Sequence, residues 1–127
     1  MRIALPAGAA AGLLLVTALG GVGLPQAMAE FPERPITYIV PWAPGGSTDQ
    51  VTRVLAKAAE ARLGQPIVVV NKPGASTAIG MGEVAAAKPD GYTLGTMSST
   101  SYLVALQGRA LPFDPIDGFS YVSYIGE

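Results

Sequence analysis

Cysteine and histidine are both absent from the 127-residue sequence, and this removes the commonest catalytic and metal-binding designs. Without them the chain has no Ser-His-Asp triad, no cysteine nucleophile and none of the usual zinc ligand sets. Disulfides are excluded as well, so packing alone must hold the fold together. Carboxylates remain as the groups on which a catalyst or a metal site would depend. We predict a protein that is not an enzyme and that has no cofactor and no metal ion.

Charge is nearly absent from residues 1–29, which we expect to be a signal peptide. Met1-Arg2 gives a positive start, residues 3–24 carry no charge, and Ala27-Met28-Ala29 has the small-x-small pattern that a signal peptidase recognises. A membrane anchor is the alternative, because the uncharged run is long enough to span a bilayer. The cleavage-type ending, without a basic flank, favours a cleaved leader and a periplasmic location for residues 30–127.

Basic residues are few and scattered after the leader. From Glu30 onward, seven Lys and Arg residues stand against nine Asp and Glu residues, a formal charge of −2. A nucleic-acid surface needs a cluster of basic side chains, and the sequence contains none. We therefore expect no nucleic acid among the partners of this chain.

Short apolar runs alternate with helix signals along residues 30–127. Runs rich in β-branched or aromatic residues predict strands at 36–40, 67–70, 92–96 and 119–125. The segments between them predict helices at 47–63, 78–87 and 102–106. This alternation is typical of an α/β fold with a mainly parallel sheet and helices on both faces.

The first predicted helix has the clearest start and stop signals. Ser47 and Gln50 have the spacing of a capping box, Asp49 lies in the first turn, and Gly64 takes the position just beyond the end. The helix face expected to pack against the core carries the apolar residues Val51, Val54, Leu55 and Ala58.

Three loops of similar composition follow the first three predicted strands, at 43–49, 73–77 and 97–101. In a parallel sheet the carboxyl ends of the strands lie at one edge, where open α/β sheets bind their ligands. Each loop is rich in Gly, Ser, Thr and other small residues, and each begins a helix whose N-terminal N–H groups favour an anion. The three loops together predict an anion site.

Each of these residues also has a plainer interpretation. Ser47 and Ser98 are explained by helix capping alone, and Asp49 by stabilisation of a helix start. Trp42 is either a core aromatic or a surface for stacking. The segment 45–49 lacks the Gly-Lys-Ser/Thr ending of a P-loop. The recurrence of one design at three loops is what favours ligand binding.

Four blocks of the sequence resemble the Bug, or tripartite tricarboxylate transporter (TctC-like), substrate-binding proteins. The blocks are PITYIVPWAPGGSTD at 35–49, RLGQPIVVVNKPGA at 62–75, KPDGYTL at 88–94 and LPFDP at 111–115. They are spread over essentially the whole chain after the leader, in family order. The resemblance implies a type II periplasmic-binding-protein fold, in which two α/β lobes close over a small carboxylate and deliver it to a membrane permease.

The resemblance also implies which residues bind the ligand. In the family, the first lobe holds a carboxyl group largely through backbone N–H groups and bridging waters. The candidate ligand-binding residues of this chain are Trp42, Ala43, Gly45, Gly46, Ser47, Asp49, Ala75, Ser76, Thr77, Ser98, Ser99 and Thr100. The second loop departs from the family pattern, which often has Gly-Gly-Asn where this chain has Ser76-Thr77-Ala78.

Family members are much longer, so residues 30–127 are expected to be the N-terminal part of the first lobe, with the second lobe absent. We interpret the chain as a fragment of a longer reading frame or as a truncated gene product. On its own it is expected to bind dicarboxylates weakly or not at all, and to expose apolar surface.

The expected function is that of a periplasmic receptor for a di- or tricarboxylate or a similar organic anion. It would serve the permease subunits of a tripartite tricarboxylate-type transporter. One alternative is an exported α/β enzyme that acts on an anionic substrate with Asp49 or Asp90 as its base. Another is a non-functional remnant.

Overall fold

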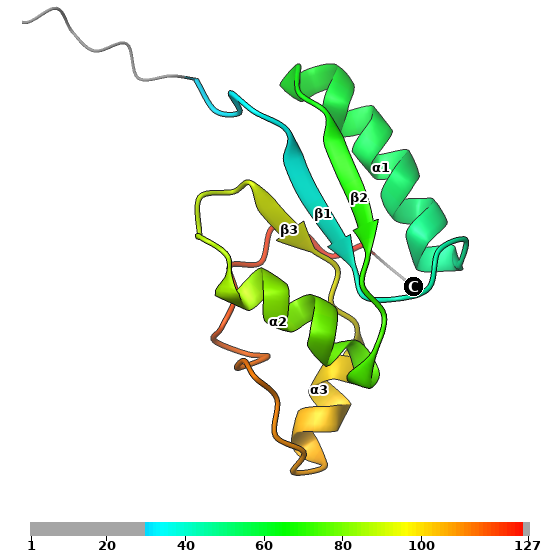
Figure 1. Cartoon of the computed structure of the whole chain (residues 1–127), viewed down its shortest axis with the longest axis vertical. Coiled ribbons are helices and arrows are strands. Elements are labelled where there is room, and N and C mark those ends of the chain that lie inside the picture. The colour runs from blue at the N-terminus through cyan, green and yellow to red at the C-terminus, as the bar shows by residue number, and fades with distance from the viewer. Residues whose placement is uncertain (1–29, 126–127) are drawn as a thin grey trace, which may run out of the picture.

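The computed structural model describes residues 30–125, in which strands and helices alternate (Figure 1). Their order is β1 (Ile36–Val40), α1 (Ser47–Leu63), β2 (Ile67–Asn71), the 3₁₀ turn η1 (Ala75–Thr77), α2 (Ala78–Ala86), β3 (Thr93–Gly95) and α3 (Ser99–Leu106). The predicted alternation is confirmed as far as α3. The predicted signal peptide, residues 1–29, lies outside the described residues.

β1 is the central strand of a three-stranded sheet in the order β2-β1-β3, and it is parallel to both neighbours. Tyr38 pairs with Val69 on one side and with Leu94 on the other. The chain thus crosses from β1 to β2 in one direction and returns over β1 to reach β3. Because such crossovers are right-handed, the two connecting helices cover opposite faces of the sheet, as Figure 1 shows.

Each face of the sheet has its own apolar contacts. Ile36 and Ile67 pack with Ala56 of α1 in a buried cluster, which half-buried neighbours such as Tyr38 and Leu94 surround. On the other face, α2 lies directly over Gly95 of β3. A Cβ atom at Gly95 would come within 2.7 Å of a Val84 methyl carbon, so glycine is what allows this close approach.

The face of α1 that packs against the sheet is not the predicted one. Its buried residues are Asp49, Thr52 and Ala56, whereas Val51, Leu55 and Val54 are exposed, Val54 to 69%. The Asp49 carboxylate accepts a hydrogen bond from Asn71 at the end of β2, which turns this side of the helix toward the sheet. Polar contacts and the small side chain of Ala56 decide the rotation of the helix.

The predicted strand at 119–125 is wrong. This segment is irregular, and its apolar side chains from Tyr121 onward are exposed, Val122 to 86%, whereas Phe119 is half-buried against Phe113. A strand needs a neighbour for its N–H and C=O groups, and no strand among residues 30–125 pairs with this segment. The hydroxyl of Tyr121 instead bonds to the carbonyl of Pro115 and to the hydroxyl of Tyr102.

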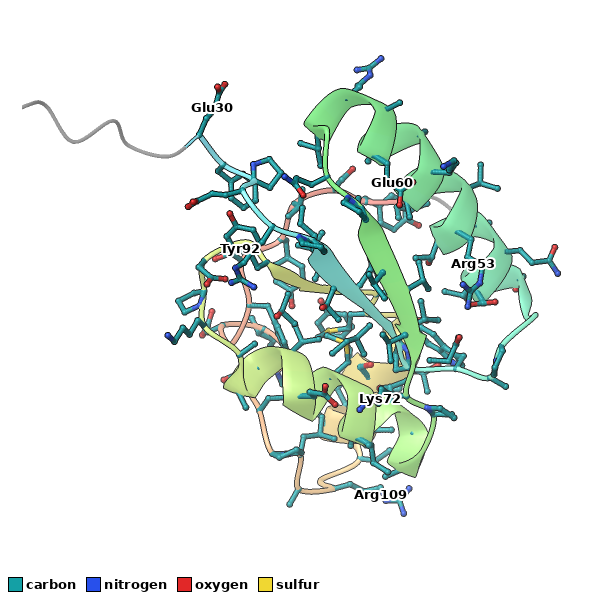
Figure 2. The ribbon with its side chains drawn as sticks, turned by 45° about the horizontal axis from the view of Figure 1, so that its top comes forward. Glu30, Arg53, Glu60, Lys72, Tyr92 and Arg109 are labelled. Carbon is teal, nitrogen blue, oxygen red and sulfur yellow. The ribbon has the colours of Figure 1, made fainter. Side chains whose placement is uncertain are left out.

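The amino end of the sheet is closed by the residues that precede β1. The guanidinium of Arg34 lies 3.7 Å from the centre of the Tyr92 ring and 3.2 Å from a carboxylate oxygen of Asp90. The N–H of Glu33 donates to the Tyr92 hydroxyl at 2.9 Å. Figure 2 shows Tyr92 at the opposite end of the sheet from Lys72. The residues before β1 thus cover only the amino end of the sheet, and the three loops lie at its carboxyl end.

Within residues 30–125, no helix combines the length and the apolar character that crossing a bilayer requires.

The rotation of α1 is tested by one substitution at two positions of the helix. Ala56→Leu overpacks the contact with Ile36 and Ile67, and we expect it to lower the free energy of unfolding by about 1 to 3 kcal/mol. Ala58→Leu is the matched control on the exposed side, where the expected change is within about 0.5 kcal/mol. Urea unfolding measures both. A larger loss for Ala58→Leu than for Ala56→Leu would mean that the apolar stripe faces the sheet.

Candidate functional site

The three predicted loops leave the sheet at one edge, where the carboxyl ends of β1, β2 and β3 lie (Figure 1). In the structure the predicted residues 47–49 and 99–101 belong to α1 and α3, so we define the first loop as 41–46, the second loop as 73–77 and the third loop as 96–98. The strand order 2-1-3 places the switch point of the sheet between β1 and β3, the position at which open α/β sheets bind ligands. The first and third loops flank it, and each leads into a helix.

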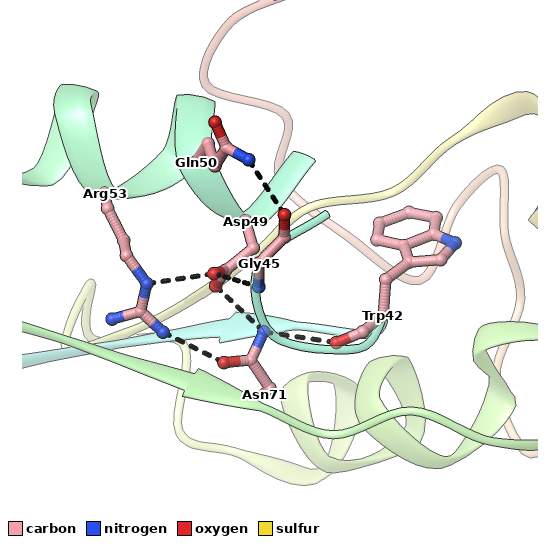
Figure 3. Close-up of polar contacts among 6 residues, drawn as sticks. All are labelled: Trp42, Gly45, Asp49, Gln50, Arg53 and Asn71. Carbon is pink, nitrogen blue, oxygen red and sulfur yellow. Dashed lines mark hydrogen bonds and ion pairs between the residues drawn. The ribbon is translucent and has the colours of Figure 1, made fainter. Parts of the chain in front are cut away.

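The carboxylate of Asp49 organises the first loop. It is buried, and it accepts hydrogen bonds from Gly45 N–H at 2.8 Å, Arg53 Nε at 3.0 Å and Asn71 Nδ2 at 2.9 Å (Figure 3). The bond from Arg53, followed by those from Gly45 and Asn71, lowers the pKa of Asp49 to about 2. The carboxylate is therefore ionised at neutral pH, and the donors around it occupy its acceptor sites.

The side chain of Asn71 joins three parts of the site. Its Nδ2 donates to Asp49 and, at 3.1 Å, to the carbonyl of Trp42, while its Oδ1 accepts a bond from Arg53 at 3.0 Å. The sequence prediction missed both Asn71 and Arg53. Arg53 was detectable from its i,i+4 spacing to Asp49, and Asn71 only as the polar end of an apolar run.

The predicted capping box is wrong. Ser47 is the first residue of α1, and Gly46 takes the N-cap position without a side-chain bond. Gln50 donates its amide to the carbonyl of Gly45 at 2.8 Å, and the Asp49 carboxylate takes the Gly45 N–H. Because the Asp49 carboxylate accepts the loop N–H, Ser47 caps no group of the loop and is exposed.

These bonds decide which N–H groups of the first loop are free for a ligand. The N–H of Gly45 is occupied by Asp49. Within the helix, the first bond is made by Gln50, whose N–H donates to the carbonyl of Gly46 at 3.0 Å. The N–H groups of residues 46–49 therefore precede the intrahelical ladder and form the positive end of the α1 dipole.

The second loop has a strained backbone. Ala75, Ser76 and Thr77 have φ angles of 46°, 52° and 78°, a region that residues other than glycine rarely enter. The Thr77 hydroxyl lies 2.7 Å from the hydroxyl of Ser101 in α3, and both side chains are buried. This bond attaches the second loop to α3 and stabilises the strained turn, an arrangement often found at functional sites.

The third loop ends in the cap that the sequence predicts. Ser98 is the N-cap of α3, and its hydroxyl accepts a bond from the N–H of Thr100 at 3.3 Å. α3 begins at Ser99, earlier than the predicted start at Tyr102, because Ser98 caps it. Ser99 and Thr100 are thus exposed in the first turn of α3.

The candidate ligand-binding residues differ in how accessible they are. Asp49 and Thr77 are buried and hydrogen-bonded within the protein, and Trp42 and Ser98 are half-buried. The other candidates are exposed on the three loops and the helix starts: Ala43, Gly45, Gly46, Ser47, Ala75, Ser76, Ser99 and Thr100. In Figure 3 the indole of Trp42 points away from Asp49, so Trp42 joins the network through its backbone.

Two cations near the carboxyl edge are paired within the protein: Arg53 with Asp49, and Lys72, which precedes the second loop, with Glu83 of α2 at 3.0 Å. Arg109, which has no ion-pair partner among residues 30–125, lines a hollow with Ala75 and Ser76 of the second loop. The described part of the chain has no group of three potential metal-ligating side chains. A hollow of about 480 Å³ lies toward the C-terminal end of α3, between residues such as Leu106 and Phe113, away from the first loop.

Comparison with known proteins identifies the family. Residues 51–127 match the family described as "Tripartite tricarboxylate transporter family receptor", TctC. The chain belongs to this family. It is 41% identical over 118 residues to Protein BugT of Bordetella pertussis, covering 91% of this chain and 36% of that protein. A UPF0065 protein in the gbd 5′ region of Cupriavidus necator is 39% identical over 117 residues, with 90% and 36% covered.

Solved structures of periplasmic binding proteins confirm the fold class. A periplasmic transporter structure is 46% identical with a TM-score of 0.63, and the match covers 68% of this chain and 29% of that one. MatC from Rhodopseudomonas palustris with bound malate is 45% identical, and another R. palustris protein, with adipate, is 37% identical. Both have a TM-score of 0.50 and cover 51% of this chain and 22% of theirs.

The fold is therefore that of the periplasmic binding proteins, with a parallel sheet and helices on both faces. The chain spans about a third of the length of the curated relatives it matches. The family is described as a receptor family, and the structural relatives include a periplasmic transporter and a periplasmic binding protein.

The charge of Asp49 gives the stability of the first loop a specific pH dependence. Because folding lowers its pKa from 3.8 to about 2, the ionised carboxylate stabilises the fold above pH 3.8, and this contribution is lost as the pH falls toward 2. We expect Asp49→Asn to be less stable than the unmodified protein at pH 7. Urea unfolding at a series of pH values should show this difference shrinking between pH 4 and pH 2.

Gln50→Ala is the control, because it removes a neutral hydrogen bond from the same loop. Its effect on the free energy of unfolding should stay constant over that pH range. A pH-independent effect of Asp49→Asn would contradict the role given to the carboxylate.

The bond between the second loop and α3 is tested by a double-mutant cycle. Thr77→Val keeps the shape of the side chain and leaves the buried hydroxyl of Ser101 without its partner, at an expected cost of about 1 to 3 kcal/mol in the free energy of unfolding. Combining Thr77→Val with Ser101→Ala removes both hydroxyls and should cost less than the sum of the single changes. Strict additivity in urea unfolding would show that the two hydroxyls do not interact.

Proposed function

We propose that this chain forms the anion-binding edge of a solute receptor for a tripartite tricarboxylate-type transporter. The ligand would be a small di- or tricarboxylate or a similar organic anion. The observation that carries the proposal is that the free N–H groups at the start of α1 lie at the same edge of the sheet as the start of α3, with its exposed residues Ser99 and Thr100. The malate and adipate bound by two TctC relatives support this ligand class.

The proposed recognition depends on hydrogen-bond donors and dipoles. The first residues of α1 present free N–H groups, and the positive ends of the α1 and α3 dipoles both lie at this edge, where they attract a carboxylate. Hydroxyls at Ser47, Ser99 and Thr100 rotate to suit the ligand and can donate to it directly or through water. Asp49, the acidic residue of the first loop and helix start, does not repel the ligand as a free charge would, because Arg53 and Asn71 bond to it.

The proposal extends to the candidate residues and to the cellular setting. The first, second and third loops would hold one carboxyl group, and a second lobe would close over the rest of the ligand. Residues 1–29 would direct the protein to the periplasm, where the permease subunits of the transporter would receive the ligand. The periplasmic transporter and binding proteins among the relatives support this location.

An enzyme acting on an anionic substrate has weaker support. A general base works best with a pKa near the working pH, and the pKa of Asp49 is about 2. Asp90, the other candidate base, bonds to Arg34 at the amino end of the sheet, opposite the loops. Asp90 therefore lies away from the loops at which the proposal places the ligand.

Ligand binding is tested on the protein encoded by the complete reading frame that contains this chain. We expect mono-, di- or tricarboxylates to raise its melting temperature, since a ligand at one hundred times its Kd stabilises a protein by about 2.7 kcal/mol. Calorimetry would then give the Kd. Stabilisation by sugars or amines alone would contradict the proposal, and turnover of a carboxylate or phosphate substrate would favour the enzyme.

The place of binding is tested with one added charge at two positions. Ser99→Asp puts a carboxylate at the start of α3, where a helix tolerates it but a bound anion is repelled, and we expect the Kd to rise about tenfold or more. Ser123→Asp adds the same charge in the exposed segment after α3 and is the control, with an unchanged Kd expected. Equal effects of the two substitutions would place the ligand elsewhere.

A further inference from the structure

Asn71 belongs neither to the apolar core nor to the ligand-binding candidates, but its side chain bonds to residues of the candidate site. Its side chain bonds to the first loop through the Trp42 carbonyl, and to α1 through Asp49 and Arg53 (Figure 3). It is not a member of the apolar cluster of Ile36, Ala56 and Ile67. We propose that Asn71 is a positioning residue, which sets the first loop in the conformation that binds the carboxylate without contacting the ligand itself. This inference rests on the proposed function.

The backbone of Asn71 is a fixed point from which the side chain acts. Asn71 is the last residue of β2 and pairs with Val40, the last residue of the central strand β1. The next N–H along the chain, that of Lys72, donates to the Val40 carbonyl at 2.9 Å. The side chain of Asn71 thus begins at the rigid end of the sheet and extends across it to the first loop, which has no ladder bonds of its own.

Each polar atom of the Asn71 side chain has a suitable partner. Nδ2 carries two hydrogens and donates to two acceptors, the Asp49 carboxylate and the Trp42 carbonyl. Oδ1 accepts from the guanidinium of Arg53. No other side chain of this length offers two donors and an acceptor in this geometry. An aspartate would place a second carboxylate against Asp49, and an alanine would leave three polar groups without their partner.

The network holds the first loop at both of its ends. Asn71 fixes the carbonyl of Trp42, where the loop leaves β1, and Asp49 fixes the N–H of Gly45, just before α1 begins. Between these two points lie only Ala43 and Pro44. Gly45 has a φ of 82°, which glycine adopts without strain, so this end of the loop depends on the bond to Asp49 for its conformation. The conformation of Gly45 in turn sets the directions of the Gly46 and Ser47 N–H groups, which follow it in the chain.

Asn71 also donates one of the three hydrogen bonds that stabilise the negative charge of Asp49. One carboxylate oxygen of Asp49 accepts from Gly45 and Arg53, and the other accepts from Asn71. Removing the amide would leave the second oxygen without a donor from the protein, close to the N–H groups that are to receive an anion. Loss of Asn71 is therefore expected to weaken carboxylate binding through a looser first loop and through greater repulsion.

The test compares Asn71→Ala with Arg34→Ala in the protein encoded by the complete reading frame. Arg34→Ala removes an ion pair and a ring contact at the opposite end of the sheet, so it is the control for loss of polar contacts alone. Calorimetry measures the Kd for the carboxylate that the unmodified protein binds. Amide hydrogen exchange at Gly45 and Gly46 without ligand reports on the first loop. We expect Asn71→Ala to raise the Kd about tenfold or more and to speed exchange at Gly45 by a similar factor.

Asn71→Asp adds a readout that a purely structural role would not affect. The charged groups facing the new carboxyl would be Asp49 and Arg53, and two adjacent carboxylates raise the pKa of one of them. Binding by Asn71→Asp should be weak at pH 7 and should recover in part as the pH falls toward 5, because the protonated carboxyl can again donate a bond. Binding by Asn71→Ala should not recover.

The outcomes separate this inference from the proposed function. Unchanged Kd and unchanged exchange in Asn71→Ala would overturn the positioning role, and so would an equal rise in Kd for Arg34→Ala. If the unmodified protein binds no carboxylate, the proposed function fails. The exchange rates at Gly45 would still decide whether Asn71 sets the first loop.

Discussion

A single buried carboxylate determines much of what this sheet edge can do. Asp49 accepts three hydrogen bonds, from the first loop, from its own helix and from the end of β2. Those bonds fix the shape of the loop, the rotation of α1 about its axis and the charge near the anion site. They also explain why a helix with apolar residues on one side buries Thr52 and Ala56 instead. An ionised group that is this well satisfied costs little to bury.

The elements that depend on local composition were predicted well from the sequence. The β-branched runs at β1 and β2 and the Gly64 stop of α1 carry their signals within a few residues. The collection of three loops at one edge followed from topology, because parallel strands end together. The periodic apolar pattern predicted the wrong rotation of α1. It takes no account of the hydrogen bond between Asp49 and Asn71, which are twenty-two residues apart in the sequence.

The features that were missed depend on partners distant in sequence. Residues 119–125 have the composition of a strand, but composition does not supply a neighbouring strand. The positive φ angles at 75–77 belong to residue types that usually avoid them, and they persist through a hydrogen bond to α3. Asn71 has no motif of its own, and only the fold shows that its amide reaches the first loop. The loop residues of the candidate site could be proposed from the sequence because their composition recurs, whereas Asn71 and Arg53, which bond to the first loop and to Asp49, were missed.

The central place of β1 in the sheet has a consequence for the order of folding. β1 leaves the ribosome before β2 and β3, yet Ile36 pairs with Ile67 and Thr37 pairs with Thr93. The segment can form no sheet until β2 has been made, and it lacks its second neighbour until β3 follows. Pairing over such distances in sequence slows folding, because a long stretch of chain must be ordered first. If residues 1–29 direct export, this delay helps to keep the emerging chain unfolded until it has crossed the membrane.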